Sequence, residues 1–131
     1  MIWMITASDD GQLESKINEI RSSNELEDLS MIFFDGSRTD FRFDELVEEI
    51  STVSMFDSRK VIHVKNLPGL YSKSSLSDAN QSTLARIIEG NIVDTFLIFS
   101  LVNREVDSRR KLIKSLKKYA HWIELKQLNE L

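Results

Sequence analysis

Hydrophobic residues along the chain recur with two different periods. Five short apolar runs predict strands, and four stretches with an apolar residue every three to four positions predict helices between them. The strands are expected at Ile2–Thr6, Met31–Phe34, Lys60–Lys65, Phe96–Leu101 and His121–Leu125. The apolar helix faces are Leu13, Ile17 and Ile20; Phe43, Leu46, Val47, Ile50 and Val53; Leu84, Ile87 and Ile88; and Leu112, Ile113 and Leu116. The order is therefore βαβαβαβαβ.

Capping and turn residues set the expected ends of these elements. The expected helix caps are Asp9 or Asp10 for the first helix, Ser77 or Asp78 for the third, and Asp107 or Ser108 for the fourth. Gly36 follows the second strand in a turn, and Gly90 is placed to end the third helix. We expect Met31–Phe34 to be a buried strand and the segment from Leu67 to Ser77 to be a long, mobile loop.

Strands that are joined by helices pair in parallel through right-handed crossovers. The expected fold is therefore α/β, a three-layer sandwich around a five-stranded parallel sheet, in a single domain over residues 1–131. Composition agrees, because 41% of the 131 residues are apolar and only four glycines and one proline occur. The chain has no cysteine, which excludes disulfides, thiolate catalysis, cysteine-based zinc sites and iron–sulfur clusters.

Charge is distributed unevenly between the two halves of the chain. Residues 1–58 contain 14 acidic and 4 basic residues, whereas residues 59–131 contain 7 acidic and 13 basic residues. This asymmetry suggests two differently charged surfaces. No apolar run approaches the ~20 residues that cross a bilayer, so we expect a soluble, intracellular protein with no membrane contact.

The expected ends of the strands carry little catalytic chemistry, although ligands of parallel α/β sheets bind there. The stretch from Ala7 to Gln12 has one glycine and no lysine, so it is not a phosphate-binding P-loop. The dinucleotide fingerprint GxGxxG, the nucleophile motif GxSxG and the zinc motif HExxH are also absent. We therefore expect no catalytic residue, no cofactor and no metal ion.

Asp9 and Asp10 form an acidic pair after the first strand and leave one enzymatic alternative open. Such a pair holds magnesium in phosphorylation receivers, which also need an aspartate after the third strand. Here that strand ends in Lys65 and Asn66. Helix capping is the favoured interpretation, and the alternatives are a receiver-like or degenerate regulatory module, or a magnesium-dependent phosphotransfer enzyme using Asp9 and Asp10.

Two surface candidates remain. Met55 and Phe56, preceded by Ser54, lie where the chain turns from the second helix to the third strand, so they either fill the core or project as an anchor for a partner. The fourth helix carries Arg110, Lys114, Lys117 and Lys118. These basic residues either contact DNA or another subunit, or simply form a solvated face near a helix end.

An ordered set of motifs resembles the first domain of the delta subunit of bacterial DNA polymerase III. The set comprises Phe34-Asp35-Gly36-Ser37, Asp40, Leu46-Val47, Met55-Phe56, Arg59-Lys60-Val61-Ile62, Val64-Lys65-Asn66, Thr95-Phe96-Leu97-Ile98-Phe99, Arg110-Lys111-Leu112 and Glu124-Leu125. The resemblance implies a sheet of the AAA+ type with a degenerate nucleotide site. It also implies a cytoplasmic bacterial protein of DNA replication, a clamp-loader subunit without enzyme activity of its own.

The same resemblance implies the partners. Family members bind the ring-shaped sliding clamp and help to open it for loading on primed DNA, through a Leu-Phe pair at the positions of Met55 and Phe56, after the position of Ser54. The lid and collar domains of the family, which contact other clamp-loader subunits, are not expected in these 131 residues, so the domain alone is expected to be a monomer. Met for Leu is a mild departure, because the two side chains have similar volume and apolarity.

Overall fold

The computed structural model describes residues 1–52, 59–90, 92 and 94–126. Within this part of the chain, strands and helices alternate in the expected order. The strands are β1 (Ile2–Ala7), β2 (Met31–Asp35), β3 (Lys60–Lys65), β4 (Thr95–Val102) and β5 (His121–Glu124). The helices are α1 (Asp10–Ser23), α2 (Phe43–Ser51), α3 (Asp78–Glu89) and α4 (Lys111–Tyr119).

The five strands form one parallel sheet in the order β2-β3-β4-β1-β5. β1 therefore lies between β4 and β5, with Met4 opposite Phe99 on one side and Trp122 on the other. Strands β2 and β5 are the two edges of the described sheet.

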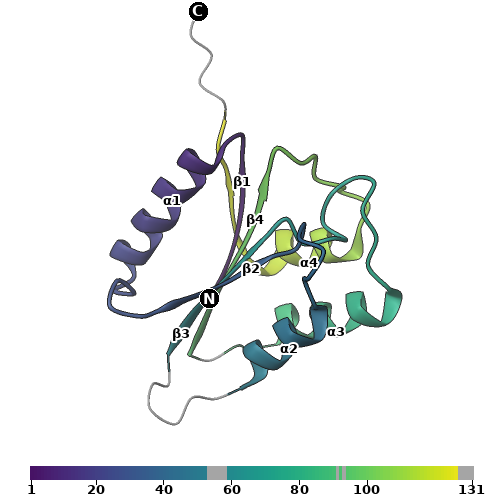
Figure 1. The fold of residues 1–131 in the computed structure, drawn as a ribbon, viewed down its shortest axis with the longest axis horizontal. Coiled ribbons are helices and arrows are strands. Elements are labelled where there is room, and N and C mark those ends of the chain that lie inside the picture. The colour runs from purple at the N-terminus through teal and green to yellow at the C-terminus, as the bar shows by residue number, and fades with distance from the viewer. Residues whose placement is uncertain (53–58, 91, 93, 127–131) are drawn as a thin grey trace, which may run out of the picture.

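The direction of each crossover decides which face its helix covers. The chain crosses the sheet one way from β1 to β2 and the other way in each later step, so right-handed crossovers place α1 on one face and α2, α3 and α4 on the opposite face. Figure 1 shows this arrangement, with α1 by itself on one side of the sheet. The expected α/β three-layer sandwich with a five-stranded parallel sheet is confirmed.

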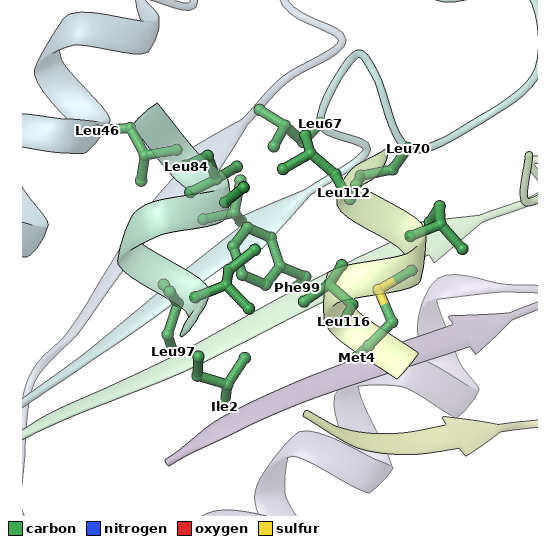
Figure 2. Packing of buried hydrophobic residues seen from close by; sticks show 14 of the residues in the cluster. Ile2, Met4, Leu46, Leu67, Leu70, Leu84, Leu97, Phe99, Leu112 and Leu116 are labelled. Carbon is green, nitrogen blue, oxygen red and sulfur yellow. The ribbon is translucent and has the colours of Figure 1, made fainter. Parts of the chain in front are cut away.

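Each face of the sheet has its own apolar core. The larger core lies under α2, α3 and α4 and includes the fully buried Met4, Leu46, Leu84, Phe99 and Leu112. Figure 2 shows these side chains converging between the helices and the sheet. The smaller core lies under α1 and is built from Trp3, Ile5, Leu13, Ile17, Ile98 and their neighbours.

Several expected boundaries were wrong. Strand β2 is a half-exposed edge strand and is not buried, because β3 flanks it on one side only and Phe33 is 52% exposed. Helix α2 ends at Ser51, and Val53, which is expected on its apolar face, lies outside the described residues. Helix α4 begins at Lys111 with Arg110 as N-cap, whereas Asp107 and Ser108 lie in the turn before it.

The segment from Leu67 to Ser77 is fixed more firmly than expected for a mobile loop. Leu67 and Leu70 are fully buried in the larger core (Figure 2). The Ser74 hydroxyl accepts a hydrogen bond from the Gly69 N–H at 2.9 Å, and Tyr71 forms an isolated bridge with Val106. Among the described helices, none is long and apolar enough to cross a membrane.

Candidate functional site

In a parallel α/β sheet, a ligand binds at the topological switch point, where two neighbouring strands connect to helices on opposite faces. Chain segments leave the neighbouring strands β1 and β4 toward opposite faces, which opens a crevice at their carboxyl ends. A shallow hollow of about 530 Å³ lies there. Its lining comes from the ends of three strands: Thr6, Ala7, Ser8, Asn103, Arg104, Glu105, Glu124, Leu125 and Lys126.

The side chain of Gln12 forms hydrogen bonds with the polar groups at one side of this crevice. Its Oε1 accepts hydrogen bonds from the Ser8 N–H at 3.2 Å and from the Ser8 hydroxyl at 2.8 Å. Its Nε2 donates to the carbonyl of Lys126 at 3.0 Å. In phosphate-binding folds the backbone N–H groups of this turn hold the phosphate. Here the Ser8 N–H already donates a hydrogen bond to the Gln12 side chain.

The acidic pair Asp9 and Asp10 performs two separate structural tasks. Asp9 caps α1, with its carboxylate accepting from the Gln12 N–H at 2.8 Å, as capping preference predicts. Asp10 forms an ion pair with Lys65, at 2.7 Å between Oδ1 and Nζ. Over the described residues, no group of three or more histidine, cysteine, aspartate or glutamate side chains is placed to hold a metal ion.

Asn66 stands immediately after β3, where a nucleoside triphosphatase would carry an acidic residue. Its backbone has a positive φ of 52°, and its side-chain Oδ1 accepts a hydrogen bond from the Val102 N–H at 2.9 Å. The side chain therefore ties the end of β3 to the end of β4 and is not directed at the crevice as a general base.

His63 and Ser100 are buried together in the middle of the sheet. His63 Nε2 and Ser100 Oγ share a hydrogen bond of 2.8 Å, and the residues are 5% and 0% exposed. Burial lowers the pKa of His63 to about 4, and the nearby positive charge of Lys65 adds to this. The imidazole is therefore neutral at physiological pH. His63 is therefore a packed histidine.

The predicted clamp-binding residues Ser54, Met55 and Phe56 lie outside the described residues. The chain on both sides of them is described, and Lys60 links the two sides. The Lys60 ammonium donates hydrogen bonds to the carbonyls of Glu49 and Thr52 at the end of α2. Lys60 is also the first residue of β3, so a single side chain fixes the end of the helix relative to the start of the strand.

The predicted basic surface is only partly exposed. Arg110 is turned inward, where it donates to the buried carboxylate of Asp107 at 3.0 Å and to the carbonyl of Ser74. Hydrogen bonds from Arg109 and Arg110 lower the pKa of Asp107 to about 2, so this carboxylate stays charged. By contrast, Lys114, Lys117 and Lys118 are exposed.

Aromatic side chains accompany these lysines. The Lys117 ammonium lies 5.5 Å from the ring centroid of Trp122 in the edge strand β5, and the Lys118 ammonium lies 5.3 Å from that of Tyr119. No Asp or Glu occurs within α4, and no ion pair to its lysines is found among the described residues. The result is a basic surface with two aromatic rings on it.

Sequence reasoning missed Gln12 and Lys60. Gln12 follows the Asp9 cap by three residues, which is the spacing of a capping box. This spacing could have drawn attention to it, although its contact with Lys126 depends on the fold. No local pattern indicates the role of Lys60. The sequence predicts it only as the first residue of a strand, whereas its partners lie at the end of the preceding helix.

Comparisons with known proteins agree over almost the whole chain. The family model for the DNA polymerase III delta subunit matches residues 3–126. DNA polymerase III subunit delta of Bacillus subtilis (strain 168) is 28% identical over 118 residues, which cover 88% of this chain and 33% of that protein. The solved structure of the Bacillus subtilis DNA clamp loader delta protein superposes with a TM-score of 0.72 at 25% identity, over 98% of this chain and 39% of that one. This chain, which spans about a third of its curated relative, therefore belongs to the DNA polymerase III delta subunit family.

Proposed function

We propose that this chain is the clamp-binding part of a clamp-loader delta subunit, which binds the sliding clamp and helps to open it for loading on primed DNA. The observation that carries the proposal is the family match over residues 3–126. The solved clamp loader delta protein, which shares the fold over 98% of this chain, supports the same proposal.

Met55 and Phe56 are the proposed anchor in the clamp, with Ser54 beside them. Transfer of two large apolar side chains from water into a pocket contributes about 3–5 kcal/mol, from which the cost of association is subtracted. Binding opens a ring only if the bound shape is better matched to the open ring than to the closed one, because a ligand shifts an equilibrium by its differential affinity.

The described flanks of the anchor support this role. Lys60 holds the carbonyls at the end of α2, and the Lys60 N–H donates to the Asp94 carbonyl at 3.2 Å. The two points from which the anchor segment leaves the domain are therefore fixed to each other and to the start of β4. Fixed attachment points reduce the conformational entropy that is lost on binding.

The strand ends support a mechanical role without bound nucleotide, metal or chemical reaction. The Ser8 N–H donates to Gln12, and Lys65 forms an ion pair with Asp10. The Asn66 side chain accepts a hydrogen bond from Val102 at the end of β4. The groups that would receive a phosphate are thus already satisfied within the domain. We propose that contact with other clamp-loader subunits is made by parts of the longer family members, and that the domain alone is a monomer.

The exposed lysines of α4 are the proposed contact with primed DNA. Lys114, Lys117 and Lys118 present positive charge without an acidic partner in the described part of the chain, which suits a phosphate backbone. Arg110 is expected to contribute less, because its guanidinium is already bonded to Asp107.

The deciding experiment measures binding of the chain to an immobilised sliding clamp. The double variant Met55→Ala with Phe56→Ala is expected to lose clamp binding while its thermal unfolding midpoint stays close to that of the wild type. Tyr119→Ala, which truncates an exposed side chain in α4, is the matched control and should bind normally. A large drop in stability with unchanged clamp affinity of the folded fraction would assign the two residues to the core and refute the proposed anchor.

A further inference from the structure

A groove runs between α1 and the strands β2 and β3 on the sheet face that α1 covers alone. Its volume is about 370 Å³. Leu13 and Ile17 of α1 form one wall, and Met31 and Phe33 of β2 form the floor with His63 of β3. In Figure 1 this part of the face lies beside α1 and has no helix of its own.

The floor of the groove is more apolar than a solvent-exposed sheet face usually is. Phe33 is 52% exposed, the largest value among the big apolar side chains described, and its ring lies 5.1 Å from that of His63. Edge strands of monomers are normally protected by charge, proline or a bulge. Residues 31–34 of β2 are all apolar, so this edge lacks that protection. An apolar edge of this kind is typical of a surface that a partner covers.

The charges bordering the groove are mostly acidic once internal pairs are removed. Lys65 is paired with Asp10. The Arg21 guanidinium keeps its positive charge, because it donates only to the neutral carbonyls of Leu26, Glu27 and Leu29, and the free carboxylates outnumber it. Exposed carboxylates without an ion pair in the described part of the chain remain on α1 and in the connection that leads to β2: Glu14, Glu25, Glu27 and Asp28.

We propose that this α1–β2 groove binds the apolar face of a lysine- or arginine-rich amphipathic helix of a partner protein. Such a helix would lie beside α1, where a second helix could complete the outer layer. Its apolar side chains would cover Met31 and Phe33, and its basic residues would face Glu14 and the acidic connection. This surface lies on the opposite face of the sheet from α2, the helix that precedes the proposed clamp anchor in the sequence.

The test uses the full chain and a fluorescent peptide of leucine and lysine, about 18 residues long and patterned as an amphipathic helix. Two control peptides have glutamate in place of lysine, or the same residues in an order without helical periodicity. We expect saturable binding of the first peptide only. Phe33→Ser should raise Kd by at least about tenfold, whereas Tyr119→Ser, at the other exposed aromatic residue, should leave Kd unchanged.

Charge reversal on α1 provides a second pair of variants. Glu14→Lys should weaken peptide binding, and Glu19→Lys, on the same helix but outside the groove lining, should have little effect. Phe33→Ser should still bind the clamp, which separates this surface from the proposed function. Equal affinity for the scrambled peptide, or equal Kd for the wild type and Phe33→Ser, overturns the proposal. So does sedimentation that shows a Phe33-dependent dimer, since the occupant would then be a second copy of this chain.

Discussion

The Lys65 ammonium lies 2.7 Å from the Asp10 carboxylate and joins the end of β3 to the first turn of α1. Both residues line the α1–β2 groove, and the pair gives Asp10 a partner other than a metal ion. The acidic residues that suggested a magnesium site are therefore accounted for by a cap, Asp9, and an ion pair, Asp10.

Titration calorimetry with magnesium-ATP and with acetyl phosphate is expected to show no saturable binding. Asp10→Asn should change the free energy of unfolding by less than about 1 kcal/mol, because the Asp10 side chain is 72% exposed and exposed pairs contribute little. Saturable binding by the wild type that Asp10→Asn abolishes would support the phosphotransfer alternative.

Stability should fall between pH 7 and pH 5 because of His63. The unfolded chain takes up a proton with a pKa near 6.5, whereas the buried imidazole in the folded protein has a pKa of about 4. The stabilising difference is present above the unfolded pKa and is lost as the pH falls toward the folded pKa. Its size between pH 7 and pH 5 is about 2 kcal/mol.

Denaturant unfolding of the wild type and of His63→Gln at both pH values measures the contribution of His63 to the free energy of unfolding. The variant should lose less stability on acidification, since glutamine can keep a hydrogen bond to Ser100 but does not titrate. His121→Gln, at an exposed histidine in β5, is the control and should follow the wild type. Parallel pH profiles for the wild type and His63→Gln would contradict the prediction.

Gly36→Ala should destabilise the domain by more than about 2 kcal/mol. A Cβ at Gly36 would lie 2.6 Å from the carbonyl oxygen of Asn66 and 2.8 Å from the Cα of Leu67, both backbone atoms that cannot move aside cheaply. At Gly11 the nearest atom is the Asp9 carboxylate at 3.2 Å, so Gly11→Ala should change stability by less than about 1 kcal/mol. Thermal unfolding of both variants tests the contrast.

Lys60→Met should weaken clamp binding without abolishing it. The substitution removes the hydrogen bonds from the ammonium to the carbonyls of Glu49 and Thr52 and leaves the proposed anchor residues intact. The anchor segment would then leave the domain from less fixed ends, and ordering them on binding would cost more. Surface plasmon resonance on an immobilised clamp measures the change.

Lys111→Met, in α4, is the control for loss of one positive charge. If Lys60→Met binds the clamp as tightly as both the wild type and Lys111→Met, the flanks do not position the anchor.

The order and type of the elements could be predicted because each depends on a local period. Leu13, Ile17 and Ile20 are buried under α1 as their spacing indicates, and Lys60–Lys65 is a strand with the expected bounds. The sequence was less informative where burial depends on neighbouring strands. Met31–Phe34 has the composition of an interior strand, and only the order of the sheet shows that it is an edge.

The polar contacts of the site were harder to predict for the same reason. The cap of α1 follows a local rule, and the sequence limits it to Asp9 or Asp10, of which the structure shows Asp9. Besides their local partners, Gln12 bonds to Lys126 and Arg110 bonds to Ser74, and these partners are distant in the sequence and meet only in the folded domain. The prediction for Met55 and Phe56 rests on their resemblance to a family motif, and it stays a prediction.

The position of β1 between β4 and β5 affects how the domain is made. Strand β1 is synthesised before the other four strands of the sheet and pairs with β4 and β5, so its two neighbours emerge only after β2, β3 and the helices between them. At about 5–20 residues per second, Trp3 and Ile5 remain without their sheet neighbours for several seconds or more on the ribosome. Such long-range pairing slows folding. The nascent chain would expose the apolar β1 during this interval, which is when a chaperone would be needed most.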